Sequence, residues 1–393
     1  MSRAVLAAAA GATAAALAVG CGQDQKPERG LPDGPVAIYV SAPTHGPAGR
    51  QGRGVLAGVR RAVGAAGGRV RGRPIRVVAL SANRPGDLDW DPGTVEANAR
   101  KAVEDRRAIA YIGEVDSGGS AVSLPLTNRA GLLQVSPADG LTSLTQTPPG
   151  KPTAGPARYY PGAKRTFARL VPADLVAATG MLHVAGVARG RRIVIVESSE
   201  IAQRELGTVL EVRMLRSGIA PVATKALGDD PAKVPDLVED LAAERPDAVL
   251  LAGDRGPAVG PLLVALRRRL PRTRVVGSPA VADLRVLGAG AATAVTAVLP
   301  LSDQDAAARR IAARLGADGA EPLYGYDAAA LVLSALRSAG ADRLRIVRAA
   351  RRSVPRIGLT GRFTLGRSGS ATRSRLAVVS VRDGRARLVP ASP

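Results

Sequence analysis

Short apolar runs alternate with longer amphipathic segments along most of the chain. The apolar runs predict strands at residues 36–42, 75–82, 108–114, 131–137, 192–198, 221–227, 247–253 and 273–279. Most of them are almost continuously apolar, which is typical of parallel strands covered on both faces. The segments between them predict helices at 94–105, 175–187, 203–217 and 231–244. This alternation indicates an α/β fold assembled from βαβ units.

A Pro- and Gly-rich stretch without hydrophobic periodicity, residues 145–165, divides the predicted strands into two sets. Two sets predict two doubly wound parallel sheets in place of one. Downstream, the pattern predicts helices at 303–315 and 322–339. The chain then ends in short alternating strands at 361–365 and 374–381, which we expect to form an antiparallel edge hairpin.

The N-terminal segment has the layout of a secretory signal. Arg3 precedes an apolar, Ala-rich run at 4–20, and Cys21 is the only cysteine of the chain. The run is shorter than the roughly 20 residues that a membrane-spanning helix needs. Residues 18–21 resemble the lipobox of bacterial lipoproteins, whose cysteine is lipidated. We therefore expect a signal peptide at 1–20, a tether at 21–34, and a body outside the cytoplasmic membrane, anchored by a lipid on Cys21.

Charge and composition narrow the range of partners. The chain has 393 residues, of which 46% are hydrophobic, enough for two domains with ordinary cores. Its net charge of +22 comes mostly from arginines spread over the whole length, and only 2% of residues are aromatic. Nucleic-acid-binding proteins gather their cations and interleave them with aromatic residues. We expect no nucleic-acid partner, and an Arg-rich surface that favours an anionic membrane face.

Signals for catalysis are weak. The two histidines, His45 and His183, and one cysteine cannot form a conventional metal cluster. Ser117 lacks the glycine spacing of a nucleophile elbow, and residues 252–260 lack that of a dinucleotide-binding turn. We expect neither an enzyme nor a cofactor.

Several motifs in order resemble one family. They are "SAPTHGPAGRQGRGVLAGVRRAV" (41–63), "WDPGTVEANARKAV" (90–103), "YIGEVDSGGSAVSLPLTNRAGLLQVSPA" (111–138), "ARLVPAD" (168–174), "YGYDAAALVLSAL" (324–336) and "GLTGRFTLGRSGS" (358–370). Together they resemble the type I periplasmic solute-binding proteins of ABC importers, in the branched-chain amino-acid binding branch. The resemblance covers essentially all of residues 35–390.

The resemblance implies two lobes joined by a hinge of three crossover strands. Lobe 1 would comprise residues 35–168 and 302–356, and lobe 2 residues 170–300 and 358–393. A small solute would lie between the lobes, at the carboxyl ends of the strands. Closure of the hinge around it would be the signal to an ABC permease in the membrane.

The segment "DSGGSAV" predicts one end of the solute site, because it follows a strand and opens a helix. The first amides of a helix have no partner within it, and the helix dipole favours an anion there. We expect the Ser117 hydroxyl and the unpaired amides of Gly118, Gly119 and Ser120 to hold a carboxylate. The alternative is that Ser117 only caps its own helix.

The resemblance implies a second set of contacts. A backbone carbonyl would come from Ala138, while Gly140 stands where relatives carry a Thr hydroxyl. Asp174 and Asp254 are candidates for the ammonium of the solute, the alternatives being a helix N-cap for Asp174 and an exposed loop charge for Asp254. Pro279 occupies the place of the usual ammonium-binding Glu. Either another acid, Asp254 or Asp283, compensates, or the solute is not an α-amino acid.

One histidine and two tyrosines complete the candidate site. His45 lies in the first Gly-Pro loop and would reach the solute, the alternative being a solvent-exposed histidine. Tyr324 and Tyr111 are rings near the site or parts of the core. Gln51 and Ile201 stand where relatives have aromatic residues. The sequence thus predicts a substrate-binding lipoprotein that captures an amino-acid-like or carboxylated solute, with a sensing or adaptor lipoprotein of the same fold as the alternative.

Overall fold

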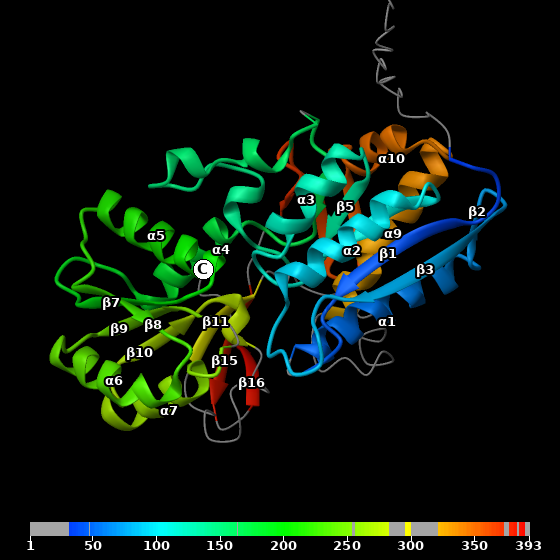
Figure 1. Ribbon diagram of the computed structural model, residues 1–393. Coiled ribbons are helices and arrows are strands. Elements are labelled where there is room, and N and C mark those ends of the chain that lie inside the picture. Colours follow the sequence, from blue (N-terminus) through cyan, green and yellow to red (C-terminus); the bar gives the residue numbers. More distant parts are fainter. Residues whose placement is uncertain are drawn as a thin grey trace, which may run out of the picture.

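The structure is a computed structural model that describes residues 31–46, 48–162, 164–253, 256–282, 295–299, 321–372, 377–382 and 385–389. The predicted signal peptide, Cys21, most of the tether, Asp254, Asp283 and the predicted helix at 303–315 lie outside these residues. Two bodies lie side by side (Figure 1), and each is built on a sheet of its own. The prediction of two sheets is therefore confirmed.

The first body, called lobe 1 below, surrounds a six-stranded sheet of order β2-β3-β1-β4-β5-β6. The strands are β1 (Val36–Ala42), β2 (Arg69–Val70), β3 (Arg73–Ser81), β4 (Ala108–Ile112), β5 (Leu133–Ser136) and β6 (Phe167–Arg169). They pair in parallel from β3 to β6, and β2 pairs antiparallel with β3. Every residue of β1 and β4 is buried, so helices must cover both faces of the sheet.

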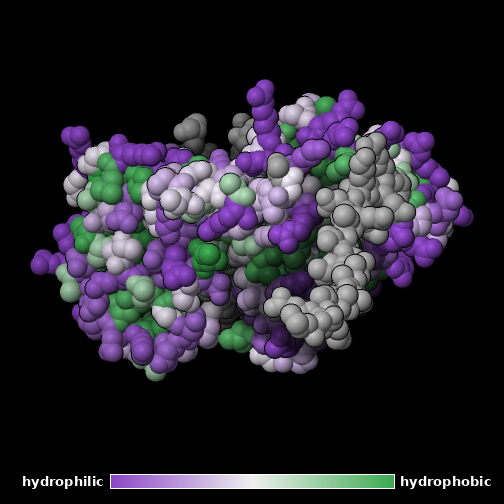
Figure 2. Space-filling view, turned by 45° about the horizontal axis from the view of Figure 1, so that its top comes forward, coloured by the Kyte–Doolittle hydropathy of each residue, from purple (hydrophilic) through white to green (hydrophobic). Residues whose placement is uncertain are grey.

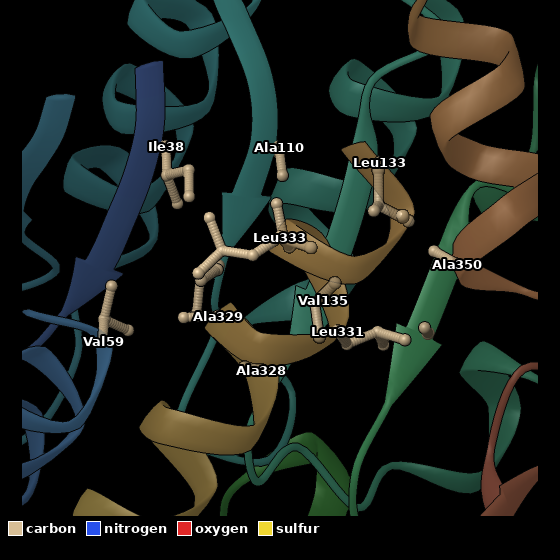
Figure 3. Close-up of a cluster of buried hydrophobic side chains, with 14 of the residues drawn as sticks. Ile38, Val59, Ala110, Leu133, Val135, Ala328, Ala329, Leu331, Leu333 and Ala350 are labelled. Carbon is tan, nitrogen blue, oxygen red and sulfur yellow. The ribbon is translucent and has the colours of Figure 1, made fainter. Parts of the chain in front are cut away.

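Among the described residues, five helices cover that sheet. They are α1 (Gly49–Ala65), α2 (Pro92–Glu104), α3 (Ser120–Arg129), α9 (Glu321–Ala339) and α10 (Arg343–Ala350). On one face, Ile38, Ala110 and Leu133 of the strands pack against Ala329 and Leu333 of α9 (Figure 3). On the other face, α2 and α3 cover a smaller apolar cluster. A helix more than 180 residues downstream of β5 thus completes this core.

The backbones of α1 and α9 approach each other very closely. A Cβ atom on Gly58 would lie 2.0 Å from the carbonyl oxygen of Pro322, and one on Gly325 would lie 2.1 Å from that of Val55. Side chains cannot approach a backbone oxygen so closely, so only glycine permits this contact.

We expect Gly58→Ala to lower the free energy of unfolding by about 1–3 kcal/mol, because the added methyl group forces α1 away from α9. Gly64 provides a matched control in the same helix, since a Cβ there would have no atom within 4 Å. Gly64→Ala should be neutral or stabilising by about 0.5–1 kcal/mol. Urea unfolding of both variants measures the difference, and equal effects would contradict the close contact.

The second body, lobe 2, surrounds a seven-stranded sheet of order β16-β15-β11-β10-β9-β7-β8. Its strands are β7 (Ile193–Ser198), β8 (Ala223–Leu227), β9 (Ala248–Ala252), β10 (Arg274–Gly277), β11 (Val295–Leu299), β15 (Ala377–Arg382) and β16 (Arg385–Val389). The strands from β8 to β11 pair in parallel, and β15 and β16 add antiparallel at the edge. The helices are α4 (Asp174–Ala185), α5 (Ile201–Arg216), α6 (Val234–Ala243) and α7 (Val259–Arg269).

A small third sheet corrects the predicted C-terminal hairpin. Strand β13 (Gly361–Leu365) pairs with β12 (Pro355–Gly358) and β14 (Ala371–Thr372), whereas β15 pairs with β11 and β16. The two predicted strands therefore exist but belong to different sheets. The pattern of alternation identifies a strand, but it does not identify its partner. Asp327 of α9 holds the β12–β13 turn by accepting hydrogen bonds from the amides of Leu359 and Thr360.

The chain passes from one lobe to the other three times, between β6 and α4, between β11 and α9, and between β14 and β15. The residues at which each lobe begins and ends stay a prediction. The Pro- and Gly-rich segment carries short helical turns, η1 (Thr142–Leu144), η2 (Pro152–Ala154) and η3 (Pro156–Tyr159). It packs between the lobes, because Leu141, Leu144 and Tyr160 share a cluster with Ala202 of α5. Two further turns, η4 (Pro231–Lys233) and η5 (Pro279–Ala282), lie in lobe 2.

The surface agrees with the composition. Hydrophilic residues spread over the face shown in Figure 2, with apolar residues scattered among them. Within the described ranges, no helix combines the length and the apolar character needed to cross a bilayer.

Candidate functional site

Three segments that follow strands or open helices meet where the two lobes join. They are the loop after β4, the loop after β5 and the first residue of α4. The amide of Gly140 donates to the Ser117 hydroxyl oxygen at 3.1 Å, and the amide of Asp174 donates to the Gly140 carbonyl at 2.8 Å. We call this group of residues, Ser117, Asp139, Gly140 and Asp174, the polar junction. It brings together three of the predicted site residues from two lobes.

The predicted carboxylate site at the start of α3 is already filled by the protein itself. The Asp139 carboxylate is fully buried. Its Oδ1 accepts from the amides of Gly118 at 3.1 Å and Leu141 at 3.0 Å, and its Oδ2 accepts from the amide of Ser120 at 2.9 Å. The amide of Gly119 donates to the carbonyl of Asp116 at 3.3 Å. The expectation that these amides are unpaired is therefore wrong.

The chemistry of the prediction was sound, but the anion is internal. An anion is stabilised at a helix N-terminus by the dipole and by charge-assisted bonds from free amides. Asp139 supplies it from the loop after β5, where the Ser136 hydroxyl oxygen accepts from the Asp139 amide at 2.8 Å. The sequence did contain a signal, because an acid stands between the candidates Ala138 and Gly140. Ala138 itself is half-buried beside it.

A buried arginine that the sequence did not single out supports the same loop. Arg169, at the end of β6, is fully buried. It donates to the carbonyls of Asp139 at 3.2 Å and Leu141 at 2.7 Å, to the Thr145 hydroxyl at 2.7 Å and to the Ser370 hydroxyl at 3.0 Å. Burial lowers its pKa, and the nearby charges of Asp139, Asp174 and Glu205 oppose that shift. Arg169 thus ties the loop after β5 to the third sheet and balances part of the acidic charge.

Asp174 lies against Gly140, where a side chain would not fit. A Cβ on Gly140 would lie 2.0 Å from Asp174 Oδ1. Burial raises the pKa of the Asp174 carboxyl to about 7, with Arg169 acting against the rise and Asp139 and Glu205 adding to it. Asp174 is not the N-cap of α4, since that position belongs to Ala173. The N-cap alternative is therefore excluded, and a partly neutral acid remains at the junction.

Glu205 and Glu114 are buried acids near this region that are not among the predicted site residues. Glu205 of α5 accepts from the amide of Ser143 at 3.0 Å, so it joins lobe 2 to the segment after β5. Glu114 accepts from the hydroxyl groups of Ser41 at 2.8 Å and Tyr111 at 2.6 Å. Burial raises the pKa of Glu114 to about 8. Glu114 follows a strand, which is a local signal, whereas Glu205 lies within α5 and has no such signal; the burial of both depends on distant segments.

The other candidates lie elsewhere. His45 follows β1, where its amide donates to Asn83 Oδ1 at 3.2 Å, and its ring Nδ1 lies 3.3 Å from the hydroxyl oxygens of Thr44 and Ser81. Tyr324 is 4% exposed in the main core of lobe 1, so we withdraw it as a solute contact. Tyr111 is fully buried as well.

Three residues of this chain, Gln51, Ile201 and Pro279, stand at positions where relatives carry aromatic or acidic residues. Gln51 donates to Glu321 Oε1 at 3.3 Å. Ile201 is 43% exposed, and its Cγ2 would be 3.2 Å from a Cβ on Gly118. Pro279 begins the turn η5. In the described part of the chain, no three His, Cys, Asp or Glu side chains are grouped so as to hold a metal ion.

Comparison with known proteins bears on the family and the fold. A family model described as periplasmic binding protein matches residues 35–386. No curated protein sequence matches the chain. Among solved structures, the leucine-binding protein LivK from Thermotoga maritima has a TM-score of 0.73 and 20% identity, over 90% of this chain and 97% of that one.

Two further structures are similar. A solute-binding protein from R. palustris in complex with benzoate has a TM-score of 0.73 and 17% identity, over 91% of this chain and 96% of that one. The branched-chain amino acid binding protein LivJ from Streptococcus pneumoniae, in complex with isoleucine, has a TM-score of 0.72 and 15% identity, over 90% of this chain and 99% of that one. The chain therefore belongs to the periplasmic binding protein family and has the fold of its type I members.

Proposed function

We propose that this protein is the extracytoplasmic substrate-binding lipoprotein of an ABC importer, and that it captures a small amine-bearing solute related to amino acids at the polar junction. The observation that carries the proposal is the meeting of Ser117, Gly140 and Asp174 from two lobes. The solutes named for the similar structures, benzoate and isoleucine, set the expected size. The N-terminal motif with Cys21 supports anchoring by a lipid and a permease partner in the membrane.

The roles of the junction residues follow from their chemistry. The Asp174 carboxyl carries a pKa of about 7, so a cationic group placed beside it would favour its ionised form. The Ser117 hydroxyl accepts one hydrogen bond from Gly140 and keeps its proton to donate. A primary amine and a carbonyl or hydroxyl on the same small molecule match these two groups.

We expect a thermal-shift screen of amines, amino-acid amides, amino acids, aromatic acids and nucleobases to yield an amine hit, because binding to the native state raises the melting temperature. Asp174→Asn should weaken that hit at least tenfold, since the variant keeps the shape and loses the charge. Asp240→Asn is the control, because Asp240 is exposed on α6 and pairs with Lys225. A panel without any hit, or equal affinities for Asp174→Asn and the unaltered protein, would refute the proposal.

A ligand-sensing or adaptor lipoprotein is the second candidate. The observation that favours it is the internal pairing of Asp139, which completes the start of α3 without a solute. In the form that has lost ligand binding, such a protein would present the surface of its two lobes to a membrane receptor. Failure of the whole panel to raise the melting temperature, together with capture of a receptor in place of a permease, would decide for it.

A further inference from the structure

We propose that Asp139 is a built-in substitute for a solute carboxylate and makes this protein select solutes that present no carboxylate to the start of α3. The inference deepens the proposed function, on which it rests for the place of the solute. Asp139 becomes the residue that sets the chemical class of the solute.

The first step is the geometry of the carboxylate. Both oxygens of Asp139 accept amide hydrogens, two at Oδ1 and one at Oδ2. Two of these amides, those of Gly118 and Ser120, lie at the start of α3, where an external carboxylate would bind, and the third, that of Leu141, belongs to the loop of Asp139 itself. α3 spans ten residues, and Ser120 is its first residue, so the positive end of the helix dipole favours an anion at this position.

The second step is the fixed position of the residue. The amide of Asp139 donates to the Ser136 hydroxyl oxygen, and its carbonyl accepts from Arg169. The side chain, the amide and the carbonyl are therefore all engaged. A solute carboxylate would have to displace an internal ligand held on three sides, so it gains less than it would at free amides.

The third step is the charge around the site. Asp139, Asp174 and Glu205 lie close enough for each of the other two to raise the pKa of Asp174. A further carboxylate would add to this repulsion, whereas an amine or an amide would not. The solutes named for the LivJ and R. palustris structures, isoleucine and benzoate, are both carboxylates. The internal carboxylate therefore predicts a different class for this chain.

The decisive experiment uses Asp139→Ala, which removes the internal anion and leaves its three amides free. We expect sodium formate to raise the melting temperature of this variant with saturation, relative to sodium chloride at the same ionic strength. The unaltered protein should show no such rise, because its site is full. Asp174→Ala is the control variant, since it also removes an acid of the junction but frees none of those amides. Formate without effect on Asp139→Ala would overturn the proposal.

A second arm needs no variant at Asp139, so it decides the question if Asp139→Ala does not fold. The unaltered protein is titrated with L-leucine, L-leucinamide and 3-methylbutylamine, which share one side chain. We expect at least tenfold weaker binding of L-leucine than of the amide or the amine. Equal or tighter binding of L-leucine would overturn the proposal.

The two proposals fail separately. If none of the three compounds nor any other solute binds, the proposed function fails, and the formate experiment still tests whether Asp139 fills an anion site. If solutes bind but carboxylates bind best, the role of Asp139 fails and solute binding stands.

Discussion

Arg169→Met should lower the free energy of unfolding by about 3–5 kcal/mol, which is the range for removing one partner of a buried charge network. The methionine fills most of the volume of the arginine, so the loss reports the charge and the hydrogen bonds. Asp139 would keep its burial without the nearby cation. The carbonyls of Asp139 and Leu141 and the hydroxyl groups of Thr145 and Ser370 would lose their donor.

Arg165→Met is the matched control for this variant. Arg165 is only partly buried, donates to the carbonyl of Thr145 at 2.8 Å and lies 5.0 Å from the centre of the Tyr160 ring. Arg165→Met should lower the free energy of unfolding by about 1 kcal/mol or less, as is usual for the loss of a single hydrogen bond near the surface. Guanidinium unfolding of both variants gives the two values. Similar losses would show that Arg169 has no special place in the fold.

A second large effect is expected from Glu114, in the dependence of stability on pH. The folded protein holds the pKa of this carboxyl at about 8, above the ordinary value of 4.5, chiefly through burial. Because the folded state then binds the proton more tightly than the unfolded state, the contribution to stability is complete below pH 4.5. It is lost as the pH rises towards 8, by up to ~1.4 kcal/mol for each pH unit.

Glu114→Gln tests this directly, since the amide imitates the protonated acid and cannot ionise. We expect the variant to be more stable than the unaltered protein at pH 8 by several kcal/mol, and the difference to shrink towards pH 5. Urea unfolding at pH 5, 6, 7 and 8 gives the two curves. Glu96→Gln, in an exposed ion pair with Arg100 on α2, is the control and should leave the curve in place. If the free energy of unfolding of Glu114→Gln and of the unaltered protein changes with pH in parallel, Glu114 does not cause the loss of stability towards pH 8.

Both predictions concern groups that the sequence did not identify. Arg169 was part of an anticipated crossover, and Glu114 stood beside the candidate Ser117 as an ordinary strand-end acid. Their burial needs segments far away in the chain. Ser370, which contacts Arg169, is 201 residues downstream, and Ser41, which contacts Glu114, is 73 residues upstream.

The sequence predicts correctly three of the residues that meet at the candidate site, but its prediction of free amides there is wrong. The strand end and the glycines after it indicate Ser117, and the resemblance to the family implies Gly140 and Asp174; the structure does bring these three residues together. The same strand end also led to free amides at the start of α3, whose ligand turned out to be Asp139. Local chemistry shows that an anion is stabilised at the N-terminus of a helix. It does not show whether the anion comes from the solvent, a solute or another loop.

The sequence by itself determined the class of fold and many of the elements. Strand β1 begins and ends where the apolar run predicted, and most of the other predicted strands and helices agree to within two residues. That success has a local cause, because burial on both faces of a parallel strand requires a continuous apolar run and an exposed helix face requires polar residues.

Only the tertiary structure decided which strands pair, which helix completes which core, and which buried charges meet. The partner of β13, the packing of α9 on α1 and the placement of Asp139 at α3 each depend on segments that are distant along the chain. Such contacts produce no periodic pattern in the sequence, because a single residue makes each of them and that residue can come from any loop that lies close in the folded protein. For this reason the proposed solute class rests on contacts that only the structure shows, while the class of fold can be predicted from the sequence.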